Sequence, residues 1–197
     1  MSKQNLKIVL LAGGASSERQ VSKQSSKGIY EALIDLGYDT SVVDPALGLN
    51  QPANMETLFE PDDGFGMDGR AYPEILQLPQ VQQADVAFLG LHGKYGEDGK
   101  MQALLELAGI RYTGSGVMSC SVAMNKDKAK SLFKDHGIVV PEGFMIQKGA
   151  FTYNEVVQRI EDELGYPVII KPNDEGSTIG LSIAHSPDEL PASLEES

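Results

Sequence analysis

A carboxylate stands at the start of a predicted helix, directly after a glycine pair. Residues 13–19 read GGASSER, and Glu18 lies where an apolar run gives way to helical periodicity. Ligands of open parallel sheets gather at the edge where the strands end, and Glu18 is predicted to lie at that edge. The dinucleotide fingerprint is excluded because its third glycine is missing. The alternative is that Ser16, Ser17 and Glu18 only cap the helix, although a cap needs neither two glycines nor the adjacent Arg19.

A histidine begins a second glycine-rich segment. Residues 91–99 read LHGKYGEDG and follow another apolar run, so they are predicted to lie at the same edge as Glu18. Three glycines leave backbone amides free to face a ligand, and His92 stands at the entry to this loop. A lone histidine is more often a structural residue with its hydrogen bonds satisfied. Two glycine-rich loops that carry polar or ionisable side chains at one sheet edge favour a ligand site.

A lysine ends a third apolar run and is followed by small residues. Residues 166–180 read YPVIIKPNDEGSTIG, which places Lys171 at the end of a predicted strand. Such a lysine can bind phosphate as a point charge while loop amides cover the remaining oxygens. The spacing is not that of the P-loop, in which lysine directly follows glycine. The alternative is an edge lysine that extends into solvent beside a flexible hairpin.

The remaining candidates carry weaker signals. Cys120 has small and apolar neighbours, which favours a buried packing residue over a nucleophile. His136 and His185 have no metal-ligand spacing and are expected to be structural or exposed. One predicted helix carries four lysines, which indicate a solvated face from which one could reach a nucleotide: Lys126, Lys128, Lys130 and Lys134.

The elements that position these residues alternate between strand and helix. The helix after Glu18 has its apolar residues Val21, Ile29, Ala32, Leu33 and Leu36 on one face, and Gly37 ends it. Residues 48–80 are predicted to be surface loop with helical turns around Leu58 and Ile75. The other expected strands of the first part are 6–12, 39–43, 85–90 and 110–113, with a helix at 100–108. The order of these elements predicts an α/β fold with a doubly wound parallel sheet over residues 1–118.

Residues 119–197 form the second predicted part. Ser186, Pro187 and Glu189 have the pattern of a capping box with proline at the first helical position, so a helix is expected to start there. The chain ends eight residues after Glu189, and we expect this element to be unfinished. The other expected elements are helices at 121–136 and 153–164 and strands at 144–147, 167–171 and 179–184.

Composition excludes several classes of protein. The 197 residues include 16 Lys+Arg and 28 Asp+Glu, a net charge of −12 that repels nucleic acid and anionic membrane surfaces. One cysteine rules out an internal disulfide. The N-terminal apolar run is too short for a membrane span. We therefore expect an acidic, soluble, cytoplasmic protein with no nucleic-acid or membrane partner.

Taken together, the motifs resemble those of the D-alanine–D-alanine ligase family, which has the ATP-grasp fold. The resemblance covers nearly the whole chain, and the first two motifs and the TGSG turn are specific to the family. It implies a Rossmann-like (pre-ATP-grasp) domain at 1–118 and an incomplete α+β ATP-grasp subdomain at 119–197. The matching stretches are 13–22 (GGASSERQVS), 91–93 (LHG), 96–99 (GEDG), 112–116 (YTGSG), 124–126 (MNK), 168–172 (VIIKP) and 175–177 (EGS).

The resemblance also implies roles for individual residues. Glu18 resembles the carboxylate that orients the ammonium of the first D-alanine, and His92, with Gly93, resembles the loop histidine beside the substrates. The expected ATP-binding residues are Lys126 and Lys171 on the phosphates, with Glu175, Gly176 and Ser177 in the loop that covers them. Ser177 is also expected to be tied to the Glu18 region, as a second catalytic residue. Glu18 and Lys171 are thus predicted to converge across one crevice.

The implied reaction uses ATP to join two D-alanines through an acyl phosphate for peptidoglycan synthesis. The family continues beyond residue 197 with its Mg²⁺ (or Mn²⁺) ligands, so we expect a truncated chain that is inactive alone, with an open sheet edge in its second part. A homodimer is implied by the family. Two alternatives stay open: a short ligase-like binding module without catalysis, and a ligase with D-lactate or D-serine as acceptor.

Overall fold

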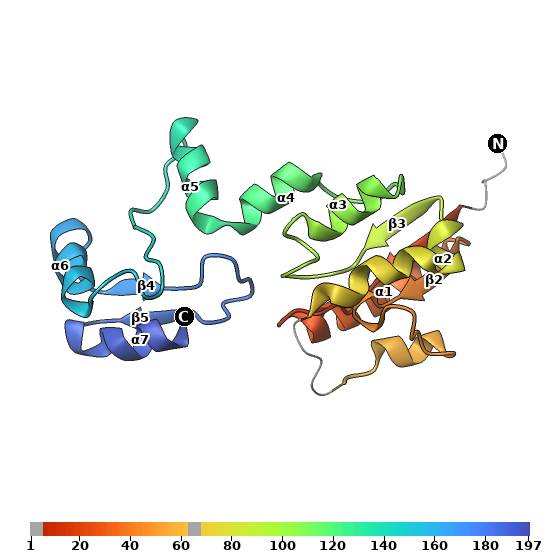
Figure 1. Cartoon of the computed structure of the whole chain (residues 1–197), viewed down its shortest axis with the longest axis horizontal. Helices are drawn as coiled ribbons and strands as arrows, with labels where there is room; N and C mark the ends of the chain where they lie inside the picture. The colour runs from red at the N-terminus through yellow and green to blue at the C-terminus, as the bar shows by residue number, and fades with distance from the viewer. Residues whose placement is uncertain (1–5, 63–67) are drawn as a thin grey trace. The chain divides into compact units, whose positions relative to one another are not determined.

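The computed structural model describes residues 6–62 and 68–197. It divides into two compact units, Met1–Ser121 and Val122–Ser197 (Figure 1). The two units are described separately below. The assignment of a substrate-binding domain to 1–118 and an ATP-grasp domain to 119–197 stays a prediction.

The first unit is built on a parallel sheet with the order β2-β1-β3. Its strands are β1 (Lys7–Leu11), β2 (Asp39–Val43) and β3 (Val86–Leu89). Alternate residues of β1 enter two different apolar clusters, one containing Val9 and Leu11 and the other containing Leu10. Both faces of the sheet are therefore covered, which explains why the strands are continuously apolar. The predicted α/β fold with a parallel sheet is confirmed.

The strand expected at 110–113 is reduced to a single parallel bridge between Tyr112 and Ala87. Thr113 explains why the pairing stops. Its hydroxyl, rather than a backbone carbonyl, accepts the hydrogen bond of the Leu89 amide at 3.1 Å. This bond to the Thr113 side chain thus replaces the next backbone hydrogen bond of the β-ladder.

Helix α1 (Arg19–Asp35) forms as predicted and is followed by Gly37 in a left-handed conformation. The predicted apolar face is only partly correct, because Leu33 is buried whereas Val21 and Leu36 are exposed. The helix also buries four polar or charged residues, Arg19, Ser22, Lys23 and Ser26. Ser22 and Ser26 both donate their hydroxyl protons to the Gly90 carbonyl, at 2.6 and 3.2 Å. Small side chains with these bonds allow the helix to approach the end of β3 closely.

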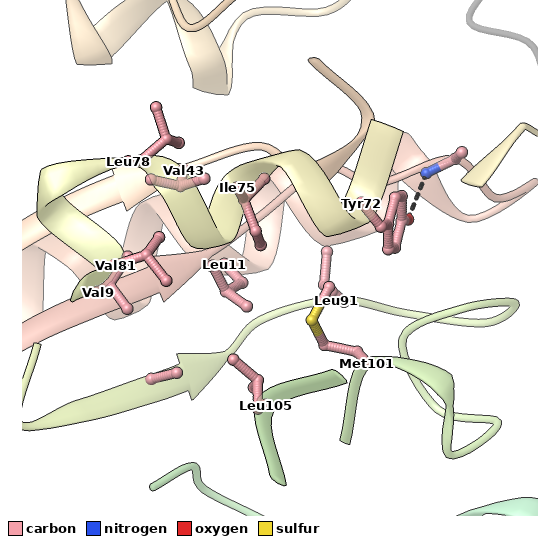
Figure 2. Close-up of a cluster of buried hydrophobic side chains, with 12 residues drawn as sticks. Val9, Leu11, Val43, Tyr72, Ile75, Leu78, Val81, Leu91, Met101 and Leu105 are labelled. Atoms are coloured by element: carbon pink, nitrogen blue, oxygen red, sulfur yellow. Dashed lines mark hydrogen bonds between the residues drawn. The ribbon is translucent and has the colours of Figure 1, made fainter. Parts of the chain in front are cut away.

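The segment between β2 and β3 contributes to the core rather than only to the surface. The predicted helical turns are present, but Leu58, Tyr72 and Ile75 are buried. Figure 2 shows Tyr72 and Ile75 among the side chains of the larger cluster. Residues 63–67 of the expected loop lie outside the described residues. The elements are η1 (Pro45–Leu47), η2 (Met55–Phe59), η3 (Gly69–Gln77) and α2 (Pro79–Gln82).

Helix α3 (Lys100–Leu107) agrees with the prediction, but the single helix expected at 121–136 does not form. Two helices take its place, α4 (Val117–Met124) and α5 (Lys126–Asp135). Asn125 separates them, because its backbone is extended and its side chain accepts the Lys128 amide. Asparagine here acts as an N-cap, which competes with continuation of the helix.

The second unit contains a two-stranded antiparallel sheet covered by helices. The residues Val156, Ile160, Val168, Ala184 and Leu190 form its buried core. The elements after α5 are α6 (Tyr153–Glu163), β4 (Val168–Ile170), β5 (Ser182–Ala184), η4 (Pro187–Glu189) and α7 (Leu190–Glu196). The mixture of helices and a small sheet agrees with the expected α+β character.

Three expectations for the second unit are wrong. Residues 144–147 form no strand. The Phe144 ring instead stacks against the Arg159 guanidinium, whose central carbon lies 4.0 Å from the centre of the ring. The strand expected from Ile179 begins only at Ser182, because the preceding residues form a turn. The helix after Ser186 is present without the capping box, since Glu189 accepts the amide of His185 instead.

Candidate functional site

Glu18 occupies the N-cap position of α1, at the end of β1, and its residue surface is 5% exposed. The Glu18 amide donates to Ser16 Oγ at 3.2 Å, and no hydrogen bond from the Glu18 side chain caps the helix. The interpretation of Glu18 as a mere helix cap is therefore wrong, and a buried carboxylate remains at the edge where ligands of parallel sheets bind.

The structure brings the His92 loop directly against this carboxylate. Gly93 has φ +67°, and a Cβ atom added there would lie 2.6 Å from Glu18 Oε2. The Ser16 hydroxyl donates to the His92 carbonyl at 2.8 Å. The His92 ring lies beside α1, with Nε2 3.1 Å from Ser25 Oγ. Only glycine at position 93 allows the loop to approach this closely without displacing the carboxylate.

The expectation that the loop's amides are free to face a ligand is wrong for four of them. The Gly93 amide donates to Glu97 Oε2 at 2.7 Å, and the Tyr95 amide donates to Asp98 Oδ2 at 3.0 Å. The amides of Gly96 and Glu97 both donate to the Gly93 carbonyl. Acceptors within the loop thus bind these donors, and the loop is a preformed platform rather than an anion-binding cradle.

A buried charge cluster fixes the backbone of the glycine pair. Arg19 Nη2 lies 2.6 Å from Asp44 Oδ2 and 2.7 Å from Asp62 Oδ2. Lys23 adds a second cation on Asp62 at 2.7 Å. Arg19 Nη1 donates to the Gly14 carbonyl at 2.9 Å, and the Gly14 amide donates to Asp44 Oδ1 at 3.0 Å. One guanidinium and one carboxylate therefore hold both sides of the same peptide segment.

Close pairing shifts the pKa values of Asp62 and Arg19 in this cluster in opposite directions. The hydrogen bond from Arg19, with a further bond from Lys23, holds the pKa of the Asp62 carboxyl well below its usual range. Burial alone would lower the pKa of Arg19, but its hydrogen bonds to Asp62 and Asp44 more than offset this and raise it. Arg19 and Asp62 are thus both charged near neutral pH.

Sequence reasoning missed Asp44, Asp62 and Tyr72, although one signal was available. Asp44 directly follows β2 and so stands at the same sheet edge as Glu18. Asp62 and Tyr72 belong to the segment interpreted as surface loop. The Tyr72 hydroxyl accepts the Ala15 amide at 2.8 Å (Figure 2), and burial raises the pKa of that hydroxyl.

In the second unit, Lys126 joins helix α5 to the loop after β4. Its ammonium donates to the carbonyls of Asn173 and Glu175. The Lys126 amide also donates to the Asn173 carbonyl at 3.0 Å, and the Asp127 amide donates to Asn173 Oδ1 at 3.0 Å. Of the four lysines expected on one helix, Lys126 is therefore the one that contacts the predicted phosphate-binding loop.

The other predicted ATP-binding residues lie in or beside the same loop. Lys171 and Ser177 are exposed, while Glu175 and Gly176 are half-buried. Ser177 and Thr178 both have positive φ values, +47° and +61°, so the loop tip is tightly turned. The convergence of Glu18 with Lys171, and the tie between Ser177 and the Glu18 region, join two separately described units and stay predictions.

The weaker candidates show little sign of chemistry. Cys120 is half-buried rather than buried, and desolvation raises the pKa of its thiol, which disfavours the nucleophilic thiolate. His136 and His185 are exposed, as expected. Within residues 6–62 and 68–197, no group of three or more His, Cys, Asp or Glu side chains could hold a metal ion. No helix in the described part of the chain is long and apolar enough to cross a membrane.

Comparison with known proteins defines the class to which this fold and site belong. The structure is similar to that of the D-alanine–D-alanine ligase of Bacillus anthracis complexed with ATP, at 29% identity and a TM-score of 0.69, over 96% of this chain and 54% of that one. It is also similar to the VanG D-Ala:D-Ser ligase of Enterococcus faecalis, at 28% identity and a TM-score of 0.72, over 98% of this chain and 59% of that one. These neighbours are ligases of the ATP-grasp class.

The sequence comparisons are more specific. Residues 7–115 match the family model of the D-ala D-ala ligase N-terminus, and residues 132–197 match that of the C-terminus. The D-alanine–D-alanine ligase of Geobacter sulfurreducens is 41% identical over 189 residues, which are 96% of this chain and 50% of the relative. The chain belongs to the D-alanine–D-alanine ligase family. It spans about half the length of the curated relatives it matches.

Proposed function

We propose that this chain provides the D-alanine-binding edge and the phosphate-binding loop of an enzyme that joins two D-alanines at the expense of ATP. In this reaction a carboxylate oxygen of one D-alanine attacks the γ-phosphate, ADP leaves, and an acyl phosphate forms. The amine of the second D-alanine then attacks the acyl carbon, and phosphate leaves. The product dipeptide serves peptidoglycan synthesis.

The observation that carries this proposal is the close approach of Gly93 to Glu18. The buried Glu18 carboxylate and the loop that carries His92 lie against each other at the N-terminal end of α1. A buried carboxylate at this position suits the ammonium group of an amino acid, because a charge-assisted hydrogen bond is stronger than a neutral one. Glu18 is thus proposed to orient the first D-alanine, and His92 and Gly93 to line its site.

Titration of the ¹⁵N-labelled chain with D-alanine tests this site. D-alanine is expected to shift the amide resonances of Gly93 and Glu18, and L-alanine is not. Glu18→Gln is expected to weaken binding about tenfold or more, since a hydrogen bond to a charged group contributes roughly 1.5–3 kcal/mol. The matched control is Glu56→Gln, which changes an exposed carboxylate in η2. Equal responses to the two enantiomers would contradict the proposal.

The second unit is proposed to bind the phosphates of ATP. Lys171 at the end of β4 and Lys126 at the start of α5 supply the positive charge, and Glu175, Gly176 and Ser177 form the covering loop. The support is the attachment of Lys126 to the carbonyls of Asn173 and Glu175, which keeps a cation at the base of this loop. Phosphoryl transfer depends mainly on positioning and charge neutralisation, and both can come from such an arrangement.

Calorimetric titration with ATP tests the phosphate site. Lys171→Met is expected to weaken ATP binding about tenfold, because a charge-assisted bond to phosphate is lost. Lys126→Met is expected to do the same and to loosen the loop. Lys134→Met is the matched control, since that ammonium pairs with Glu142 at the surface, 3.0 Å away. An affinity unchanged by Lys171→Met would contradict the role of that residue.

Magnesium would supply the charge neutralisation of the phosphates in this reaction. The described residues do not fit such a site, because they contain no metal-holding group of acidic, histidine or cysteine side chains. We expect D-alanine-dependent phosphate release by the 197-residue chain to stay at background, and release well above background would contradict this expectation.

A ligase with another acceptor is the second candidate function. It is favoured by the similarity to the VanG D-Ala:D-Ser ligase, which extends over 98% of this chain. Glu18 would then bind the first D-alanine as before, and the second substrate would differ. Substrate profiling with D-alanine, D-serine and D-lactate separates the two functions. Cytoplasmic location and a homodimer are further proposals that follow from the family alone, and sedimentation tests the dimer.

A further inference from the structure

We propose that Ser25 is a positioning residue for His92. Its hydroxyl keeps the neutral imidazole of His92 protonated at Nε2 and leaves Nδ1 as a hydrogen-bond acceptor. The part of this inference that concerns substrate rests on the proposed function. The part that concerns the imidazole stands on the geometry of α1 and the loop after β3.

The Ser25 hydroxyl has a single proton to donate. Ser25 Oγ lies 3.0 Å from the carbonyl oxygen of Val21 and 3.2 Å from that of Ser22, one turn back in α1. It also lies 3.1 Å from Nε2 of His92. Carbonyl oxygens can only accept hydrogen bonds, whereas a neutral imidazole nitrogen can donate or accept.

Two arrangements of protons are possible, and one of them makes more of these contacts into hydrogen bonds. If the hydroxyl donates to a helix carbonyl, Oγ is free to accept the N–H of Nε2 from His92. If the hydroxyl donates to Nε2 instead, Oγ faces the carbonyls of Val21 and Ser22 at hydrogen-bond distance with no proton between them. The first arrangement is therefore favoured, and it requires the proton of the neutral ring to reside on Nε2.

The backbone on either side of the ring is held as firmly as the ring itself. The His92 carbonyl accepts the Ser16 hydroxyl at 2.8 Å, and the Gly93 amide donates to Glu97 Oε2 at 2.7 Å. The residue is half-buried. With the backbone fixed on both sides, the contact to Ser25 determines which nitrogen carries the proton rather than where the loop lies.

This assignment gives His92 a defined role beside Glu18. An imidazole protonated at Nε2 presents Nδ1 as an acceptor, and the chemical group that it can bind is an N–H donor such as the ammonium of a D-amino acid. Glu18 and His92 would then both act as acceptors for substrate ammonium groups. The opposite tautomer would present a donor and would repel an ammonium group.

The test is to observe the imidazole nitrogens and the Hε2 proton of His92 in the ligand-free, ¹⁵N-labelled chain by NMR at about pH 8.5, where imidazoles are neutral. In the unaltered chain, His92 is expected to show a slowly exchanging Hε2 proton and an unprotonated Nδ1. The exposed His185 is the internal reference for a ring without such a contact, and His136 is the contrast, since its Nδ1 lies 2.9 Å from the Leu132 carbonyl.

Substitutions at Ser25 complete the test. Ser25→Ala is expected to abolish the slowly exchanging Hε2 signal and to move the His92 nitrogen shifts toward those of His185, while Ser25→Thr, which keeps the hydroxyl, retains the original spectrum. Ser131→Ala is the matched control, since it removes a similar hydroxyl bond to the preceding helical turn, at 2.9 Å to the Asp127 carbonyl. The amide spectrum of β1 reports that each variant is folded.

Two results would overturn the inference. One is a proton on Nδ1 of His92 in the unaltered chain, and the other is an Hε2 signal that is unchanged by Ser25→Ala. Because the measurement uses no substrate, it is independent of D-alanine binding. Failure of the chain to bind D-alanine, with the expected imidazole spectrum intact, would overturn the proposed function and leave the role of Ser25 in place.

Discussion

The two loop regions proposed to bind substrate differ in how the protein holds them. Around Glu18, the amides of Gly14 and Ala15 donate to buried side chains, and the charges of Arg19 and Asp44 are paired within the protein. In the loop after β4, Lys126 contacts the carbonyls of Asn173 and Glu175 at the base, and the side chains of residues 177–179 at the tip are exposed.

The difference indicates two ways of building a binding site. The Glu18 edge is already formed before any ligand binds, because its hydrogen bonds are made within the protein. Such a site avoids the entropy of ordering loops on binding, and this favours recognition of a small amino acid. The loop after β4 exposes the side chains of residues 177–179 to solvent, so a phosphate ligand can bind there and order them further. Exposed loops with few internal contacts are the segments that open most readily.

The largest expected effect comes from breaking the buried ion pair of the first unit. Arg19→Met leaves the buried Asp44 carboxylate without its cation, and we expect the free energy of unfolding of this unit to fall by about 3–5 kcal/mol. Urea titration followed by amide resonances of each unit measures the loss. Lys134→Met, which removes an exposed ion pair of the second unit, is expected to change stability by less than about 1 kcal/mol. Similar losses for the two variants would contradict the comparison.

A smaller effect is expected from adding one methyl group beside Glu18. Gly93→Ala forces alanine into φ +67° and places its Cβ 2.6 Å from Glu18 Oε2. The left-handed backbone alone should destabilise the unit by about 1–2 kcal/mol. Displacement of the flexible carboxylate should weaken D-alanine binding more than about tenfold.

The matched control for this variant is Gly109→Ala. Gly109 has φ +71° with nothing within 4 Å of an added Cβ, so it has the same backbone strain without the contact. We expect a similar loss of stability and unchanged D-alanine binding. If both variants bound D-alanine equally well, the close approach of Gly93 to Glu18 would have no functional meaning.

The smallest effect concerns Asp62, and it depends on pH. Its pKa is lowered in the folded state, mainly by the hydrogen bond from Arg19. The stabilisation is therefore complete above the unfolded pKa near 4 and is lost as the pH falls through the lower folded pKa. Asp62→Asn should destabilise the first unit by about 1 kcal/mol at pH 7, because the carboxylate is partly exposed.

Urea titration of the unaltered chain and of Asp62→Asn at a series of pH values measures this dependence. The difference in stability between the two should shrink steadily below about pH 4. A difference that is constant from neutral to acid pH would show that the charge of Asp62 does not stabilise the unit.

The sequence was sufficient to predict the elements whose signals are local. Apolar runs predicted β1, β2 and β3, and Gly37 marked the end of α1. The inner face of α1 could not be predicted in this way, because Ser22 and Ser26 are buried through bonds to Gly90, more than 60 residues away. A polar residue is buried when its partner is present, and periodicity contains no information about partners.

The position of the candidate site could be predicted from the sequence, but the side-chain contacts that hold its residues in place could not. Glu18 and His92 could be placed at one edge because both follow parallel strands. The contact between Ser25 and His92 and the cluster of Arg19 with Asp44 and Asp62 depend on side-chain geometry that the sequence does not reveal. The break at Asn125 had a local signal, an asparagine followed by Asp127 in the first turn, which favours a new helix start.

Hydrogen exchange of the chain with and without ATP tests the contrast between the two loop regions most directly. Without ligand, we predict strong protection at the amides of Gly13, Gly14, Ala15 and Gly93, and rapid exchange at residues 176–178. Addition of ATP should slow exchange at residues 176–178 and leave the first group unchanged. Rapid exchange around Glu18 without ligand, or a loop after β4 that is equally protected with and without ATP, would contradict the account.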